Sequence, residues 1–132
     1  MTTEETRHIL VVDDESAVLN LLTALLKTRG YKTLAATNGR EALALFKEHE
    51  DDVNLLITDV VMPEMDGIEL AVQIRSLRPK LPVLFVSGFC ENIPGSLQEW
   101  EAVDKPFKPQ ELLKKIADIL TSSNSKGRAK NA

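Results

Sequence analysis

Short apolar runs alternate along the chain with longer segments in which apolar residues recur every three or four positions. The runs have the length and composition of buried strands, and the longer segments have the period of amphipathic helices. Regular alternation of the two is typical of consecutive βα units and predicts an α/β fold on a central parallel sheet. The expected strands cover residues 9–13, 33–37, 55–59, 83–87 and 102–104.

The helical segments carry start and stop signals. Asn38 and Glu41 form a capping pair at the start of the second segment, while Gly30 and Pro79 follow the ends of the first and third. The expected helices cover residues 16–28, 38–46, 66–77 and 109–120. Between residues 90 and 100, Pro94-Gly95 interrupts the pattern, so no full helix is expected there.

Length and charge narrow the classes of function. A chain of 132 residues has room for one domain, which we place at residues 7–121, with an N-terminal extension at 1–6 and a flexible polar tail at 122–132. With 16 Lys and Arg against 20 Asp and Glu, the net charge of −4 gives no field that attracts nucleic acid or an anionic membrane. No apolar run approaches the ~20 residues that cross a bilayer, and residues 1–6 lack a secretory signal. A cytoplasmic protein without direct nucleic-acid or membrane contacts is expected.

The single cysteine narrows the possible chemistry further. Cys90 has no partner for an internal disulfide and cannot form a cysteine-based metal cage. We expect it to be a buried or partly buried thiol.

Polar residues stand where the predicted strands end. Carboxyl ends of parallel strands meet at one edge of the sheet, which is where ligands bind in such folds. Three carboxylates gathered there repel one another, and a divalent cation relieves the repulsion; oxygen ligands with several waters suit Mg²⁺. A carboxylate beside Mg²⁺ and a lysine is a plausible nucleophile for phosphoryl transfer. The residues concerned are Asp13, Asp14, Asp59, Ser87 and Lys105.

Four motifs occur in a fixed order over residues 7–120. They are Asp13-Asp14-Glu15, the run from Asp59 to Gly67, Val86-Ser87-Gly88 and Lys105-Pro106-Phe107. This ordered set resembles the receiver domain of bacterial two-component response regulators. The resemblance implies a flavodoxin-like (βα)5 fold with strand order 2-1-3-4-5.

The resemblance also implies a function. Asp59 would accept a phosphoryl group from the phosphohistidine of a sensor histidine kinase or histidine phosphotransfer protein, or from a small donor such as acetyl phosphate. The domain would catalyse its own phosphorylation and dephosphorylation without being a turnover enzyme. The modification would shift its conformation and regulate an unknown downstream protein, with the chain a monomer or a phosphorylation-dependent dimer. It would be either a complete single-domain regulator or the receiver of a longer protein.

Further residue roles follow from the same resemblance. Asp14, Asp59 and the backbone carbonyl of Val61 would bind Mg²⁺ directly, with Asp13 acting through a metal-bound water. Lys105 would pair with Asp59 before the reaction and with a phosphoryl oxygen afterwards, and Ser87 would donate to another phosphoryl oxygen. The Lys105-Pro106 peptide would be cis, and Pro63 and Gly67 would shape the loop after Asp59.

The chain departs from the family pattern at two places. Receiver domains commonly have Tyr or Phe three positions before the lysine, where this chain has Ala102, and the segment from Gly88 to Asp104 is short. The fourth helix of the family should therefore be short or irregular. Trp100 and Phe89 are the candidates to replace the missing ring, and for Trp100 a core role is favoured. Val61 and Phe89 would flank the phosphoryl group and offer no polar atom to orient an attacking water, which predicts slow loss of phosphate.

Three other functions are compatible with a parallel α/β sheet. A Mg²⁺-dependent phosphatase of the haloacid dehalogenase type also uses an aspartate nucleophile, but it places this residue on the first strand and a second Asp two positions later, where this chain has Glu15. A flavin-binding protein needs an anion-friendly first loop, whereas three acidic residues stand here. A pseudo-receiver that only docks partners would not need the complete acidic set.

Overall fold

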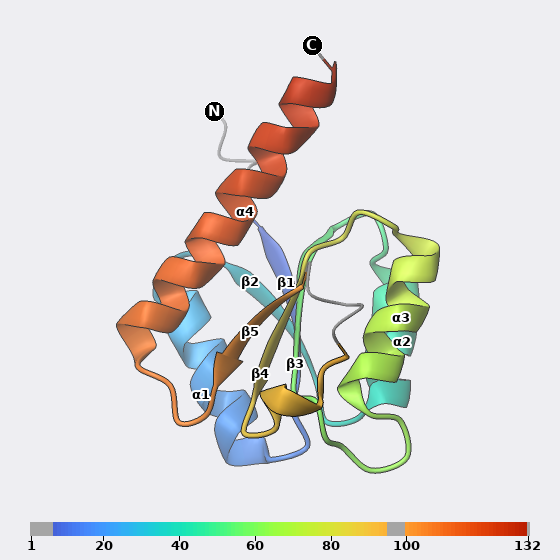
Figure 1. The fold of residues 1–132 in the computed structure, drawn as a ribbon, viewed down its shortest axis with the longest axis vertical. Helices are drawn as coiled ribbons and strands as arrows, with labels where there is room; N and C mark the ends of the chain where they lie inside the picture. Colours follow the sequence, from blue (N-terminus) through green and yellow to red (C-terminus); the bar gives the residue numbers. More distant parts are fainter. Residues whose placement is uncertain (1–6, 95–99, 132) are drawn as a thin grey trace.

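The computed structural model describes residues 7–94 and 100–131, with side chains described except at positions 92 and 123–131 (Figure 1). The extension expected at residues 1–6 lies outside the described residues. Five parallel strands form one sheet in the order β2-β1-β3-β4-β5, which confirms the predicted order. The strands are β1 (His8–Val12), β2 (Lys32–Ala36), β3 (Val53–Thr58), β4 (Val83–Ser87) and β5 (Glu101–Asp104).

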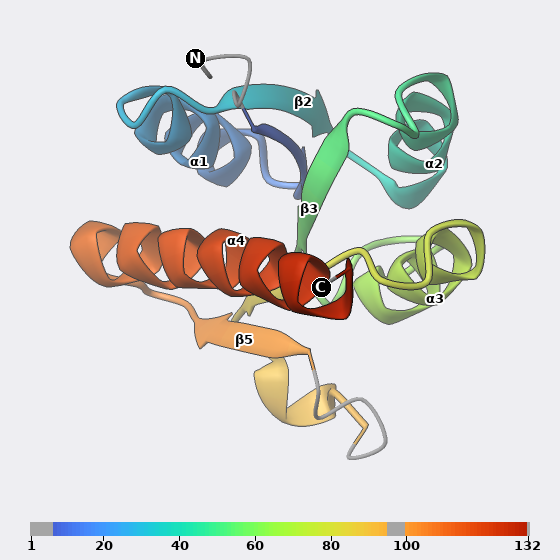
Figure 2. The ribbon, with the colours of Figure 1, turned by 90° about the horizontal axis from the view of Figure 1, so that it is seen from above.

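Helices cover both faces of the sheet, as Figure 2 shows: α1 and α4 lie on one face, and α2 and α3 on the other. They are α1 (Ser16–Lys27), α2 (Gly39–Glu48), α3 (Gly67–Leu77) and α4 (Pro109–Asn131). Along β1, Ile9 and Val11 enter the core under α1 and α4, and Leu10 and Val12 enter the core under α2 and α3. This strand is therefore buried on both sides, which explains its continuous apolar sequence.

Two of the predicted helices begin at a side-chain cap, of which the one at Asn38 was expected. The side chain of Asn38 accepts a hydrogen bond from the Glu41 amide at 2.7 Å, and Asp66 accepts one from the Glu69 amide at 2.8 Å. The Glu41 carboxylate accepts from the Thr37 amide at 2.9 Å, one residue before the cap. Local sequence thus determines where α2 and α3 begin, and with them the loops that enter these helices.

The connection from β4 to β5 lacks a full α-helix in its described part. Residues 90–92 form a three-residue 3-10 helix, η2 (Cys90–Asn92). This agrees with the predicted short or irregular fourth helix. Residues 95–99 lie outside the described part of the chain. Trp100 packs on buried Phe85 with ring centroids 5.7 Å apart, and the Arg75 guanidinium lies 5.4 Å from its ring centroid. The expected core role of Trp100 is confirmed.

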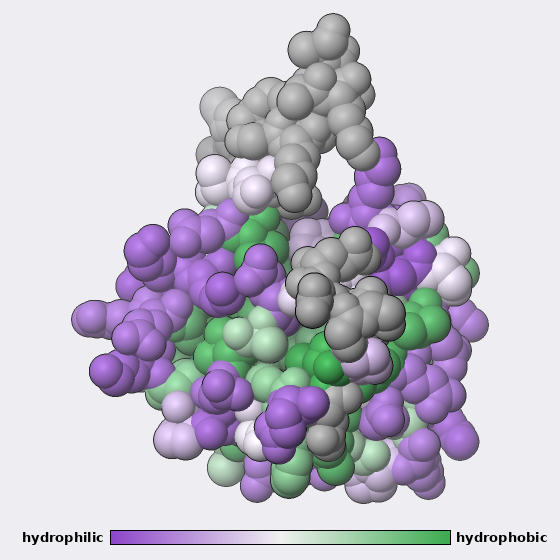
Figure 3. All heavy atoms as spheres, in the orientation of Figure 1, coloured by the Kyte–Doolittle hydropathy of each residue, from purple (hydrophilic) through white to green (hydrophobic). Residues whose placement is uncertain are grey.

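Ala102 lies exposed on β5 beside Phe85, its register partner on β4. Figure 3 presents this edge of the molecule and shows apolar surface over β5 between hydrophilic areas. Because Ala102 has no ring, the described part of β5 carries no aromatic side chain where the family commonly has one.

The last helix is longer than its sequence pattern predicted. The apolar period ends at Leu120, but the backbone of α4 remains helical to Asn131 and extends away from the sheet (Figure 1). The predicted end is therefore about three turns too early. The added segment contains no proline, but seven of its eleven residues are Thr, Ser, Asn or Gly, which disfavour helix interiors, so its composition carried no helical signal. Among the helices of the described residues, α4 included, no stretch is both long and apolar enough to span a bilayer.

Candidate functional site

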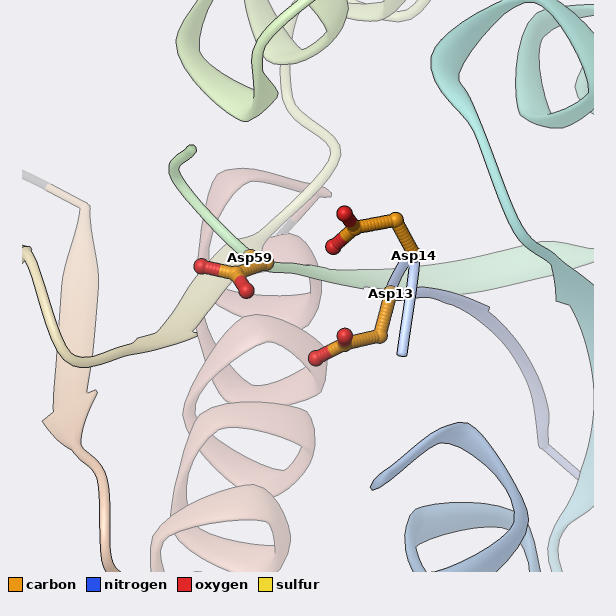
Figure 4. Close-up of side chains that lie close together, drawn as sticks. All are labelled: Asp13, Asp14 and Asp59. Atoms are coloured by element: carbon orange, nitrogen blue, oxygen red, sulfur yellow. The ribbon is translucent and has the colours of Figure 1, made fainter. Parts of the chain in front are cut away.

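The ends of β1 and β3 bring three carboxylates together. Asp13 follows β1 and is fully buried, Asp59 follows β3 and is 7% exposed, and Asp14 is exposed. One oxygen from each lies within 4.8 Å of the others. Figure 4 shows the side chains of Asp13 and Asp14 extending toward the same side, where Asp59 lies. A set of hard carboxylate oxygens at this spacing fits Mg²⁺ by its chemistry.

Lys105 follows β5 and reaches two of these carboxylates. Its Nζ donates to Asp13 Oδ2 at 2.8 Å and to Asp59 Oδ2 at 3.0 Å. The structure thus brings together the four charged residues that the sequence predicted from three separate strand ends. The fifth, Ser87, is fully buried at the end of β4, and its carbonyl accepts the Lys105 amide at 2.9 Å.

Burial and ion pairing have opposite effects on the pKa values of Asp13 and Lys105. Burial raises the pKa of Asp13, and the hydrogen bond and charge of Lys105 only partly offset that rise. Burial by itself lowers the pKa of Lys105, but the hydrogen bonds and charges of Asp13 and Asp59 outweigh it, so the net pKa is raised. Lys105 is therefore a firmly protonated ammonium that neutralises part of the carboxylate charge.

The loop after β3 holds the Asp59 carboxylate by its backbone. Asp59 Oδ1 accepts the Val60 amide at 2.6 Å, which leaves Oδ2 to Lys105. The Val60 carbonyl in turn accepts the Gly67 amide at 2.7 Å, so the loop closes onto the first residue of α3. Glu64 in this loop adopts a left-handed φ of 70°, which the sequence did not predict. Val61 lies two residues beyond Asp59, and its predicted role as a carbonyl ligand stays a prediction.

The turn after β4 fixes the Ser87 side chain. Ser87 Oγ accepts the Phe89 amide at 3.1 Å, so the hydroxyl proton remains available to donate elsewhere. The side chains of Phe89 and Val61 are 49% and 46% exposed. The Lys105-Pro106 peptide is cis, as the resemblance implied.

Cys90 stands next to this turn as a half-buried thiol, as expected. Its sulfur lies 3.4 Å from the Ser87 carbonyl and 3.5 Å from the Val103 carbonyl. Burial, with a further contribution from the nearby Asp104 carboxylate, raises the pKa of Cys90 to about 11. The thiol is therefore protonated and weakly nucleophilic.

Glu15 is one residue whose place at the site the sequence analysis missed. Its Oε1 lies 3.7 Å from Lys105 Nζ, and its amide donates to Asp13 Oδ1 at 2.9 Å. The only signal available in the sequence was that it directly follows two predicted ligands.

Comparisons with known proteins agree with this geometry. The family model of the response regulator receiver domain matches residues 9–117. The chain is 35% identical over 117 residues to the sensor kinase CckA of Brucella abortus, covering 85% of this chain and 12% of that protein. It is 27% identical over 118 residues to the response regulator SaeR of Staphylococcus aureus, covering 86% of this chain and 50% of that protein. The chain therefore spans half or less of the length of these curated relatives.

Solved structures show the same fold. The receiver domain of the hybrid histidine kinase CckA superposes with a TM-score of 0.75 at 34% identity, covering 86% of this chain and 98% of that one. A CheY-like receiver domain protein from Methanospirillum hungatei superposes with a TM-score of 0.82 at 32% identity, covering 92% of this chain and 99% of that one. With the fold, the ordered motifs and the family match in agreement, this chain belongs to the response regulator receiver domain family.

Proposed function

We propose that the chain is a phosphorylation-activated signalling switch in which Asp59 accepts the phosphoryl group. The observation that carries the proposal is the position of Lys105 Nζ, 2.8 Å from Asp13 and 3.0 Å from Asp59. A protonated ammonium held beside a buried acceptor carboxylate stabilises the charge of an incoming phosphoryl group. The family match supports this type of function and gives no support to the haloacid dehalogenase alternative.

The proposed reaction transfers one phosphoryl group. A carboxylate oxygen of Asp59 forms a bond to phosphorus as the phosphorus–nitrogen bond of a phosphohistidine breaks, and the released imidazole takes up a proton. The Lys105 ammonium pairs with one phosphoryl oxygen, and the Ser87 hydroxyl donates to another. These residues promote the chain's own phosphorylation and its later hydrolysis, so the chain is a phosphoacceptor and not a turnover enzyme.

The reaction is proposed to require Mg²⁺. Asp14, Asp59 and the Val61 carbonyl would hold the ion directly, with Asp13 acting through a bound water. When bound, the ion neutralises charge on the carboxylates and the phosphoryl group. The three carboxylate oxygens within 4.8 Å of one another support this assignment.

Partners and location are proposed from the family. The donor would be a sensor histidine kinase or a histidine phosphotransfer protein, and the output an unknown downstream protein in the cytoplasm. The phosphoryl group would favour one of two conformations, so its effect is limited by how differently the partner binds them. Residues 7–121 are proposed as the switching domain, which agrees with the family match over residues 9–117.

Intact-mass measurement after incubation with acetyl phosphate and Mg²⁺ tests the proposal. We expect a gain of about 80 Da, the mass of one phosphoryl group, that Asp59→Asn abolishes. An unchanged mass, or a gain that persists in Asp59→Asn, would contradict the assignment of Asp59. Sustained turnover of p-nitrophenyl phosphate would instead favour a phosphatase.

A further inference from the structure

Glu15 is the one residue of the Asp13-Asp14-Glu15 motif to which the proposed chemistry gives no role. It is the N-cap of α1, yet its side chain makes no capping hydrogen bond. Its Oε1 lies 3.7 Å from Lys105 Nζ, and its side chain is 67% exposed. The carboxylate therefore stands at the edge of the site and is not committed to the helix backbone.

Lys105 and a divalent cation would draw on the same carboxylates, Asp13 and Asp59. The two short contacts of the Lys105 ammonium are with Asp13 and Asp59, both members of the carboxylate cluster. Glu15 contacts the ammonium but is not part of that cluster. Because like charges repel strongly where water is scarce, a divalent cation in the cluster would drive the ammonium away from Asp13.

We propose that Glu15 is a positioning residue that receives the Lys105 ammonium when Mg²⁺ occupies the carboxylate cluster. A movement of about 1 Å brings Nζ from 3.7 Å to ordinary hydrogen-bond distance of Glu15, and the four-carbon stem of lysine permits it. The Glu15 amide is anchored to Asp13 Oδ1 at 2.9 Å, which keeps the second partner close to the first. Lys105 then stays near Asp59 without competing for the cation. This inference rests on the proposed function, which supplies the cation.

Two opposite effects on Mg²⁺ affinity follow. Lys105→Met removes the competing ammonium and should tighten Mg²⁺ binding. Glu15→Gln removes the second partner of the ammonium and should weaken it. Loss of one negative charge also weakens binding through the general field, so Glu15→Asp is informative: it keeps the charge but is one methylene too short for the contact.

The test is a double-mutant cycle on Mg²⁺ dissociation constants, measured by NMR titration of backbone amides without any phosphodonor. With Lys105 present, we expect Glu15→Gln and Glu15→Asp to raise Kd by about three- to tenfold. In the Lys105→Met background only the effect of the lost charge remains, and Glu15→Gln should raise Kd by less than about twofold. The control is Glu48→Gln on α2. The Glu48 side chain is 72% exposed, and its replacement removes the same charge away from the site, so Kd should be unchanged.

Equal effects of Glu15→Gln with and without Lys105, or no effect in either, would overturn the inference. Retention of parental Kd by Glu15→Asp would do the same, because charge alone would then suffice. If Lys105→Met does not fold, Lys105→Gln takes its place in the double-mutant cycle. Failure of the parent to bind Mg²⁺ would overturn the metal-dependent function itself. If the parent binds Mg²⁺ but Glu15→Gln has the same effect on Kd in both Lys105 backgrounds, only the role of Glu15 is overturned.

Discussion

Gly67 and Asp59 approach each other so closely that no side chain fits between them. A β-carbon added to Gly67 would lie 1.7 Å from the carbonyl oxygen of Asp59. The first residue of α3 is thus packed directly on the backbone of the proposed phosphoacceptor. The requirement for glycine here is steric, since only the absence of a β-carbon permits this approach.

Gly67→Ala should therefore destabilise the protein. Displacement of the Asp59 backbone is expected to lower the free energy of unfolding by about 1–3 kcal/mol or more, as overpacking does in well-packed cores. Urea denaturation followed by circular dichroism measures the change. Gly88→Ala is the matched control, because a β-carbon at Gly88 would meet nothing within 4 Å. Equal stability of the two variants would show that the loop relaxes freely.

The ion pair between Lys105 and Asp13 should make stability depend on alkaline pH. The pKa of Lys105 is raised above its ordinary value of 10.5, because its bonds to Asp13 and Asp59 outweigh the opposing effect of burial. A group whose pKa is higher in the folded state contributes stability that is complete below the unfolded pKa and is lost as pH rises through the folded one. Removal of one partner of a buried pair is also destabilising.

Lys105→Met should therefore unfold at lower urea concentration than the parent at pH 8 in the absence of Mg²⁺. The difference between the two proteins should shrink above pH 10.5, as the parent loses its ammonium. Comparison with the variant cancels the effect of alkaline pH on the rest of the protein. A difference that stays constant from pH 8 to strongly alkaline pH would mean that the ammonium contributes no net stability.

The parallel sheet and the grouping of the site residues were predictable from the sequence pattern, whereas the strand order was implied by the family resemblance. Parallel strands buried on both faces, such as β1 and β3, read as continuous apolar runs, and their carboxyl ends must meet at one edge. The residues after those runs, Asp13 and Asp59, were therefore expected side by side before any coordinates. The roles of Asp59, Ser87 and Val61 in the reaction remain predictions.

Features that depend on packing between distant segments were not predictable. The close approach of Gly67 to Asp59 depends on where α3 packs, although the resemblance placed Gly67 in the loop. The left-handed backbone of Glu64 has no signal in its residue type. The end of α4 was misjudged because apolar periodicity reports only a buried helix face, and this period ends at Leu120 while the helical backbone continues to Asn131.

Cys90 should react slowly with thiol reagents in the native protein. Its pKa of about 11, caused first by burial and then by Asp104, leaves a thiolate fraction of about one in a thousand at pH 8. Alkylation by iodoacetamide, followed by intact mass, should be about a hundredfold slower than in the urea-unfolded chain. Asp104→Asn should accelerate the reaction, because it removes a negative charge that disfavours the thiolate. Native alkylation at the unfolded rate would contradict both the burial and the pKa.

Two exposed apolar residues, which we expect to flank the phosphoryl group, should make phosphate loss slow. Val61 and Phe89, 46% and 49% exposed, offer no polar atom that could orient an attacking water. In the double variant Val61→Asn, Phe89→Glu, we expect the phosphorylated protein to lose its 80 Da adduct about tenfold faster or more, as polar groups recruit the water. Decay is followed by intact mass after removal of acetyl phosphate, with Val72→Asn as control, a 50% exposed valine on α3. If the double variant holds its phosphate as long as the parent does, hydrolysis is limited by something other than water orientation at these two positions.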